Sequence, residues 1–138
     1  IIVYVSPEVV YQRLVAGGFV PDAVCTTNPE FDRFVRERFG QGLLAKADLG
    51  LELVGWGYAG PYSGRLVSAD TVVLLARFRG REVVVLIDRT RDDRGLSVPP
   101  ESGLHLHRAE VGRLVLYEVT PSPDPELLPL LYDPDHPR

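Results

Sequence analysis

Hydrophobic residues follow two different periods along this chain. Within residues 1–40 they recur three or four positions apart, which is the period of an amphipathic helix. One such stripe consists of Phe31, Phe34, Val35 and Phe39. From about residue 51 onward the hydrophobic residues alternate with polar ones or form short apolar runs, a pattern typical of β-strands. The pattern therefore predicts helices first and a sheet afterwards.

Three short motifs predict where helices begin: "SPE" at residues 6–8, "NPE" at 28–30 and "DPE" at 124–126. The first residue of each can cap free N–H groups, proline suits the first helical position, and the helix dipole favours glutamate in the first turn. The predicted helices span about 7–16, 29–38 and 125–131, with Gly40 capping the second and Pro129 breaking the short third.

Five strands are predicted between the second and third helices, at about 51–58, 68–78, 82–88, 104–108 and 113–119. Arg79-Gly80 predicts a tight hairpin turn, because glycine readily adopts positive φ, and residues 109–112 predict a second turn. We therefore predict an α+β fold in a single domain over residues 1–138. It is an antiparallel meander of four to five strands, covered on one face, with two N-terminal helices and a short C-terminal helix.

The composition of the chain argues against two classes of function. Nineteen acidic and fifteen basic residues give a net charge of −4, which argues against nucleic-acid binding. The longest apolar runs have only strand length, so no direct membrane span is expected in this chain. The first residue is not methionine, so we expect a processed product or a fragment. The composition suits the periplasm, the cell envelope and the cytoplasm alike.

Cys25 and two histidines are the candidates for chemistry. Cys25 is the only cysteine, and its apolar neighbours favour burial, although a nearby helix N-terminus would favour a reactive thiolate. His105 and His107 lie two residues apart on a predicted strand and therefore share one face, with solvent exposure on an edge strand as the simplest interpretation. The alternative is a metal site that Cys25 or Asp88 would complete, or a Cys25–His105 hydrolase.

Three further segments contain residue types that can form sites. Trp56, Tyr58 and Tyr62 form the best candidate contact patch. "GWGYAG" (55–60) has the glycine spacing of a nucleotide loop, but no helix pattern follows it. "DRTRDDR" (88–94) contains carboxylates that could bind Ca²⁺ or Mg²⁺, but the interleaved arginines would neutralise them, which favours a solvated loop that continues to residue 103.

The segments "GLELVGWGY" and "VVLLARFRGREVVVLIDR" resemble the C-terminal domain of bacterial anti-sigma-factor-like proteins. The flanking "FVPDAVCTTNPEFDRFVRERFGQGLL" and "GRLVLYEVTP" are similar to uncharacterised, planctomycete-like bacterial domains that share this hairpin. The resemblance covers residues 18–121 and implies a small domain that binds a protein or senses a ligand, often outside a membrane anchor. The chain lacks the zinc-binding, sigma-contacting module and the transmembrane helix of such proteins. No functional residue is implied.

Together these features favour a non-catalytic protein-interaction or sensor domain, as a subunit of a larger assembly or of an anti-sigma-like regulatory system. Its expected partner is another protein or a second copy of itself, and no cofactor is expected. The chemical alternative is the thiol or metal site of Cys25, His105 and His107. A third hypothesis is an accessory subunit whose "IIVYV" end (1–5) pairs with a partner or packs on the sheet.

Overall fold

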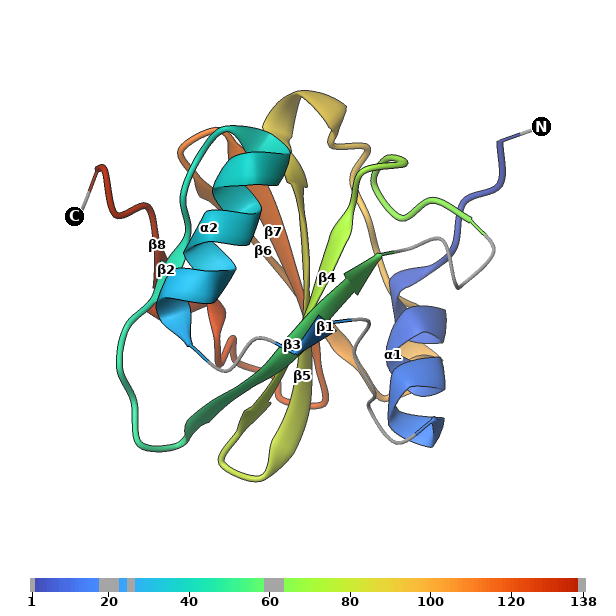
Figure 1. Cartoon of the computed structure of the whole chain (residues 1–138). Coiled ribbons are helices and arrows are strands. Elements are labelled where there is room, and N and C mark those ends of the chain that lie inside the picture. The colour runs from blue at the N-terminus through green and yellow to red at the C-terminus, as the bar shows by residue number, and fades with distance from the viewer. Residues whose placement is uncertain (1, 18–22, 25–26, 59–63, 137–138) are drawn as a thin grey trace.

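The computed structural model describes residues 2–17, 23–24, 27–58 and 64–136, and it has an antiparallel sheet flanked by two helices (Figure 1). The helices are α1 (Pro7–Ala16) and α2 (Asn28–Phe39). The strands are β1 (Ala23–Val24), β2 (Leu44–Ala45), β3 (Leu51–Tyr58), β4 (Val72–Phe78), β5 (Arg81–Arg89), β6 (His105–Val111), β7 (Leu114–Thr120) and β8 (Leu131–Tyr132). The predicted α+β class with two N-terminal helices is confirmed, but the short strand β1, which was not predicted, lies between the two helices and belongs to the main sheet.

Six strands form the main sheet in the order β1-β3-β4-β5-β7-β6, and β2 pairs with β8 in a second, two-stranded sheet. Both predicted hairpins form. Arg79 and Gly80 link β4 to β5 with φ of 53° and 80°, as the turn chemistry predicts. The second turn is Gly112-Arg113, later than predicted, because β6 continues to Val111.

The strand order departs from the sequence order at the end of the sheet. β5 pairs with β7, and β6 lies outside β7 as an edge strand. The connection that allows this is the predicted polar loop, which contains the short 3-10 turns η2 (Thr90–Asp92) and η3 (Pro100–Ser102). It is not simply solvated, since Leu96 and Leu104 pack against the core. The edge position of the two histidines thus follows from this crossing.

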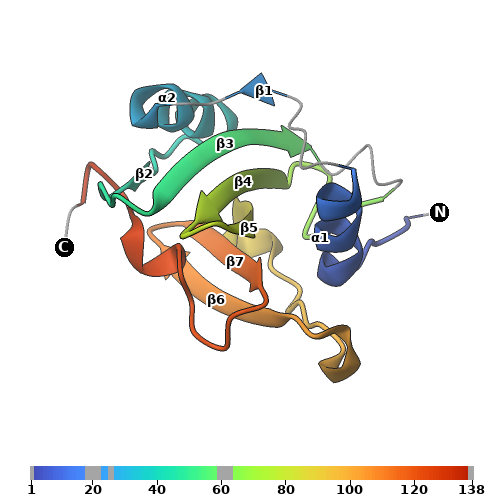
Figure 2. The same ribbon diagram turned by 90° about the horizontal axis from the view of Figure 1, so that it is seen from below.

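The sheet is covered on both faces, not on one as the sequence analysis expected (Figure 2). α2, β2 and β8 pack on one face, whereas α1 and the 90–104 connection pack on the other. The reason lies in the central strands: six consecutive residues of β5 and all seven of β7 are buried. Side chains on both faces of such strands need a covering layer.

Two of the three predicted helix starts are confirmed, but their caps differ. α1 begins at Pro7, although Ser6 makes no side-chain capping bond. In α2 the cap is Thr27, whose hydroxyl accepts from the Glu30 N–H and donates to its carboxylate. Asn28 instead exchanges two hydrogen bonds with the backbone of Ala45 in β2. This side chain ties the start of α2 to the second sheet.

The predicted third helix, 125–131, is reduced to the 3-10 turn η4 (Leu128–Leu130), which leads directly into β8. Pro129 lies within this turn, in agreement with its predicted breaking role. The residues after it pair with β2, in register Ala45 with Leu131 and Leu44 with Tyr132. Because these residues form a strand, the helix cannot continue beyond the turn.

The remaining predicted features concern the helix stripe and the N-terminus. Phe31 and Val35 are fully buried, Phe34 and Phe39 pack beside them, and Gly40 caps α2 with φ of 75°. Val5 is buried, and residues 3–5 pair with Arg65 beside the sheet.

Among the described residues, none of the helices has the length and apolar character that spanning a membrane requires.

Gln41 joins α2 to the β6–β7 turn through its buried amide. The amide nitrogen donates to the Val111 carbonyl oxygen at 2.9 Å, and the amide oxygen accepts from the Arg113 N–H at 2.8 Å. Gly112, between these two residues, has φ of 58°, and a Cβ there would lie 2.6 Å from the Gln41 amide oxygen. The position therefore requires glycine for two separate reasons.

This double requirement is testable by comparing Gly112→Ala with Gly80→Ala. Gly80 also has positive φ, but a Cβ there would have nothing within 4 Å. We expect Gly80→Ala to cost about 1–2 kcal/mol in unfolding free energy, the usual penalty of a left-handed conformation. Gly112→Ala should cost about 1–3 kcal/mol more, because Gln41 must give up buried hydrogen bonds. Urea denaturation measures both, and equal losses would contradict the Gln41 contribution.

Candidate functional site

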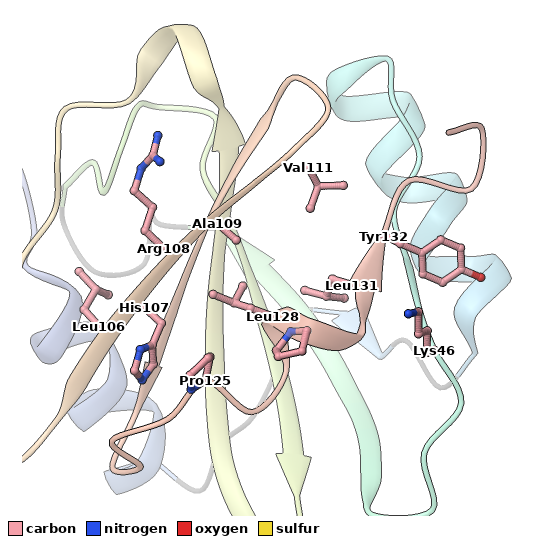
Figure 3. Close-up of a pocket in the computed structure, with 11 residues that line it drawn as sticks. Lys46, Leu106, His107, Arg108, Ala109, Val111, Pro125, Leu128, Leu131 and Tyr132 are labelled. Carbon is pink, nitrogen blue, oxygen red and sulfur yellow. The ribbon is translucent and has the colours of Figure 1, made fainter. Parts of the chain in front are cut away.

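A large cavity among the described residues lies beside the edge strand β6, on the face of the sheet that α2 and the second sheet cover (Figure 3). We call it the β6 groove; its volume is about 580 Å³. One side is β6 itself, and the other is η4, β8 and the residue after β2. Its lining residues are Lys46, Leu106, His107, Arg108, Ala109, Val111, Pro125, Leu128, Pro129, Leu131 and Tyr132.

The floor of the β6 groove is apolar and its rim is basic. Ala109 and Val111 face Leu128 and Leu131 across the floor. Lys46, the only lysine of the chain, is exposed at the rim, and His107 lies on the opposite wall. None of the described lining residues is acidic. The surface thus combines apolar contact with positive charge, as binding sites for apolar anions or acidic segments do.

A buried carboxylate holds the far wall of the groove in place. Glu118 is fully buried on β7, and its oxygens accept hydrogen bonds from the backbone N–H groups of Glu126, Leu127 and Leu128 at 2.6–2.8 Å. These are the free donors that the sequence analysis assigned to a cap at residue 124. A carboxylate from a neighbouring strand provides the cap instead, which explains why the turn lies against the sheet.

Glu126 adds a second attachment from the same segment. One carboxylate oxygen accepts from the Thr120 hydroxyl at 2.8 Å, and the other accepts from the Arg81 guanidinium at 2.5 Å. The Glu126 side chain is only 6% exposed, so this ion pair is shielded on the acidic side. Together Glu118 and Glu126 fix the residues that precede η4, and with them the position of Leu128 in the groove.

On the other face of β6, Arg108 belongs to a hydrogen-bonded cluster that directs it away from the groove floor. Its guanidinium contacts the carboxylates of Asp93 and Glu110, and Asp93 also accepts hydrogen bonds from the Tyr117 hydroxyl and the Gly95 N–H. Burial raises the pKa of Asp93, but these hydrogen bonds outweigh it and leave that pKa below its usual range. Burial and the bond to Asp93 raise the pKa of Tyr117.

The two predicted histidines share a face of β6, as the strand period requires. Their rings are nearly parallel, with centroids 6.3 Å apart, and His107 Nε2 lies 3.3 Å from the Ser122 carbonyl oxygen. Leu104 and Leu106 pack against the core on the opposite face, as expected. Within the described part of the chain, no group of three potential metal ligands comes together. His107 contributes instead to the wall of the β6 groove.

The other predicted site residues are not brought to this groove. Cys25 and Tyr62 lie outside the described residues, as does the side chain of Tyr58, so the thiol site and most of the aromatic patch remain predictions. Trp56 stacks on Phe34 of α2, with ring centroids 3.5 Å apart, and packs at the margin of the core. Its ring therefore helps to attach α2 to the sheet.

The acidic residues of "DRTRDDR" were predicted to be solvated, and this is wrong for two of them. Asp88 is fully buried and accepts from the hydroxyls of Ser68 and Thr71 at 2.7 and 2.8 Å. The Asp93 side chain is 15% exposed and belongs to the Arg108 cluster. The folded chain brings hydroxyl and guanidinium donors to these carboxylates from distant positions, and no local pattern signals such donors.

The groove-forming residues carried little sequence signal. An isolated lysine such as Lys46 does not by itself indicate a binding site. Leu128 and Leu131 were assigned to a helix. Glu118 shares a strand face with Leu114 and Leu116, and the sequence analysis assigned no role to it. The single hint was its position within "RLVLYEV", where a carboxylate interrupts an apolar run and burial would require a donor set.

Glu118→Gln tests the attachment of the groove wall. The amide retains one acceptor oxygen but places an NH₂ group against backbone donors, so we expect a loss of about 1–3 kcal/mol in unfolding free energy. Amide hydrogen exchange should accelerate at Glu126, Leu127 and Leu128. Glu101→Gln, at an exposed glutamate, is the matched control and should change neither quantity. Unchanged protection of the three amides would contradict the capping role.

Asp93→Asn tests the electrostatics of the Arg108 cluster through pH. The Asp93 pKa is lower in the folded chain than in the unfolded one, so its charge stabilises the fold above the unfolded value of about 4 and less as the pH falls further. We expect Asp93→Asn to lose about 1 kcal/mol at neutral pH and the difference from wild type to shrink below pH of about 4. Asp92→Asn is the control, and a pH-independent difference would refute the assignment.

Comparisons of the chain with protein-family models, with curated proteins and with solved structures gave no match. The similarity of the β4–β5 hairpin to anti-sigma-factor-like domains therefore stays a prediction from the sequence. The geometry of the β6 groove is what supports a function for this chain.

Proposed function

We propose that this chain is a non-catalytic protein-interaction domain and that the β6 groove, with the outer edge of β6, is its contact surface. The observation that carries the proposal is that this large cavity lies along an edge strand of the main sheet. Edge strands offer unpaired backbone groups, and cavities of this volume bury a large part of a ligand.

The polar chemistry of the fold supports binding over catalysis. The buried carboxylates of Asp88, Glu118 and Glu126 all accept hydrogen bonds from within the fold. Such carboxylates join segments of the fold, and their oxygens already accept hydrogen bonds from the protein itself. The groove itself offers apolar side chains, one lysine and one imidazole, which suit recognition of a partner surface.

The partner is another protein or a second copy of this chain. Membership of a larger assembly or of an anti-sigma-like regulatory system is consistent with such a domain, and the hairpin similarity is the support for the latter. In either case the β6 groove is the surface that contacts the partner. A photo-crosslinking residue placed in the groove would therefore reach that partner.

Tyr132 is the appropriate position for this experiment, because it lines the groove, is half-buried and has an aromatic ring that p-benzoylphenylalanine replaces with little change. Irradiation of the Tyr132 variant in its native cells should give a discrete covalent adduct, whose mass identifies a partner or a dimer. The matched control places the same residue at Tyr4, an exposed tyrosine on the N-terminal segment.

The pair of variants separates the outcomes. An adduct from Tyr132 that is absent from Tyr4 supports the groove as the contact surface. An adduct from Tyr4 alone, or none from Tyr132, would contradict the proposed surface. Circular dichroism and a thermal melt of both variants establish that the folded chain was tested.

A further inference from the structure

We propose that the β6 groove binds an extended, acidic segment of the partner protein, which adds to the main sheet as a new strand beside β6. This inference rests on the proposed function and specifies the kind of segment that is bound. Three features of the described residues carry it: the free backbone groups of β6, the apolar floor, and the distribution of charge around the groove.

The backbone of β6 has donors and acceptors available on its outer side. Val111 and Leu114 close a two-residue turn, so the pair is hydrogen-bonded, and the bonding alternates along an antiparallel ladder. His105, His107, Ala109 and Val111 therefore bond to β7. The N–H and C=O groups of Leu106, Arg108 and Glu110 point to the outside, where no described residue forms a backbone hydrogen bond with them.

The opposite wall contributes apolar contact and one acceptor. Lys46 N–H donates to the Leu130 carbonyl oxygen at 2.8 Å, so the neighbouring pair, Ala45 and Leu131, is not hydrogen-bonded across β2 and β8. The Leu131 carbonyl therefore points away from β2, and its N–H already bonds to Leu128. In Figure 3, β8 lies between β2 and the groove, on the side toward β6.

The charge of the groove selects an acidic segment. Lys46 is exposed, forms no ion pair with any described residue, and lines the groove, as His107 does. Arg108 is already paired with Asp93 and Glu110 on the other face of β6, so it adds little net charge. A basic segment would bring its charge toward Lys46 without a compensating carboxylate in the lining, because none of the described lining residues is acidic.

The side-chain period of a strand fits this arrangement. In an added strand, alternate side chains point to opposite faces. The set on the groove face would cover Ala109, Val111 and Leu128 with apolar side chains and bring one acidic side chain to Lys46, because the floor and Lys46 lie on the same face of the sheet. The Arg108–Glu110 ion pair on the far face is the kind of charged feature that limits unselective pairing at an edge. The expected segment therefore carries both apolar residues and an acidic residue at alternate positions, on the face that it turns to the groove.

Synthetic peptides test this directly, with fluorescence anisotropy as the readout. The probe is a short labelled peptide with valine, valine and glutamate at alternate positions and serine between them, and its counterparts replace glutamate with lysine or carry N-methyl groups on alternate backbone nitrogens. We expect the acidic peptide to bind, the lysine peptide to bind at least about tenfold more weakly, and binding of the acidic peptide to weaken with salt. N-methylation on the pairing edge should abolish binding, because it removes the donors.

Variants of the chain test the same contacts from the other side. Lys46→Glu should weaken binding of the acidic peptide about tenfold, whereas Arg33→Glu, the same kind of charge reversal on the exposed face of α2, should not. Glu110→Pro removes an outward N–H group that makes no hydrogen bond to β7, and an edge strand tolerates such a change. The variant should bind the acidic peptide more weakly than Glu110→Ala does. Thermal melts verify that each variant is folded.

Two results would overturn the inference. One is that the acidic peptide does not bind. The other is that the lysine peptide or the N-methylated peptide binds as tightly as the acidic peptide. Neither result bears on the crosslinking experiment at Tyr132, which tests whether the groove contacts any partner. An adduct at Tyr132 together with failure of the peptides would mean that the groove binds a folded surface and not a strand. Binding of the acidic peptide without an adduct at Tyr132 would support the strand-binding inference and contradict the groove as the contact surface in the cells tested.

Discussion

The central strands of the sheet are apolar on both faces, and most of the architecture answers that constraint. β4, β5 and β7 present buried side chains to both sides, so each side needs a cover. α1 and the 90–104 connection supply one cover, and α2 with the small β2–β8 sheet supplies the other. A chain of 138 residues has few elements to spare for this purpose. The C-terminal segment is consequently used as part of a layer and not as a separate helix.

The use of the C-terminal segment as a cover creates the candidate site. Glu118 reaches out of β7 to the three N–H groups that begin this segment, and Glu126 reaches back to Thr120 and Arg81. These attachments hold η4 and β8 beside β6 but do not fill the space between them. The β6 groove is that remaining space, and it lies next to the side of β6 that pairs with no strand among the described residues.

Local patterns predicted the elements well and the contacts between them poorly. The stripe around Phe31 and Val35, the αL cap at Gly40 and the turn at Arg79-Gly80 depend on neighbours within a few residues, and the structure has them. The cap of α2 was predicted one residue late, because Thr27 and Asn28 are both good caps and only Ala45 of β2 distinguishes their roles. Glu118 and the groove depend on pairing across the sheet, which local patterns do not encode.

The sequence by itself determined the α+β class, the two N-terminal helices, the segments of the five long strands β3 to β7 and the hairpin turns, because each follows from periodicity or from the backbone preferences of glycine and proline. Tertiary structure alone decided that β7 lies between β5 and β6 and that both faces of the sheet are covered. It also decided that the carboxylates of Asp88, Asp93 and Glu118 accept hydrogen bonds within the fold. The physical reason is that a carboxylate can be buried only where donors meet it, and those donors come from residues up to twenty-four positions away in the sequence.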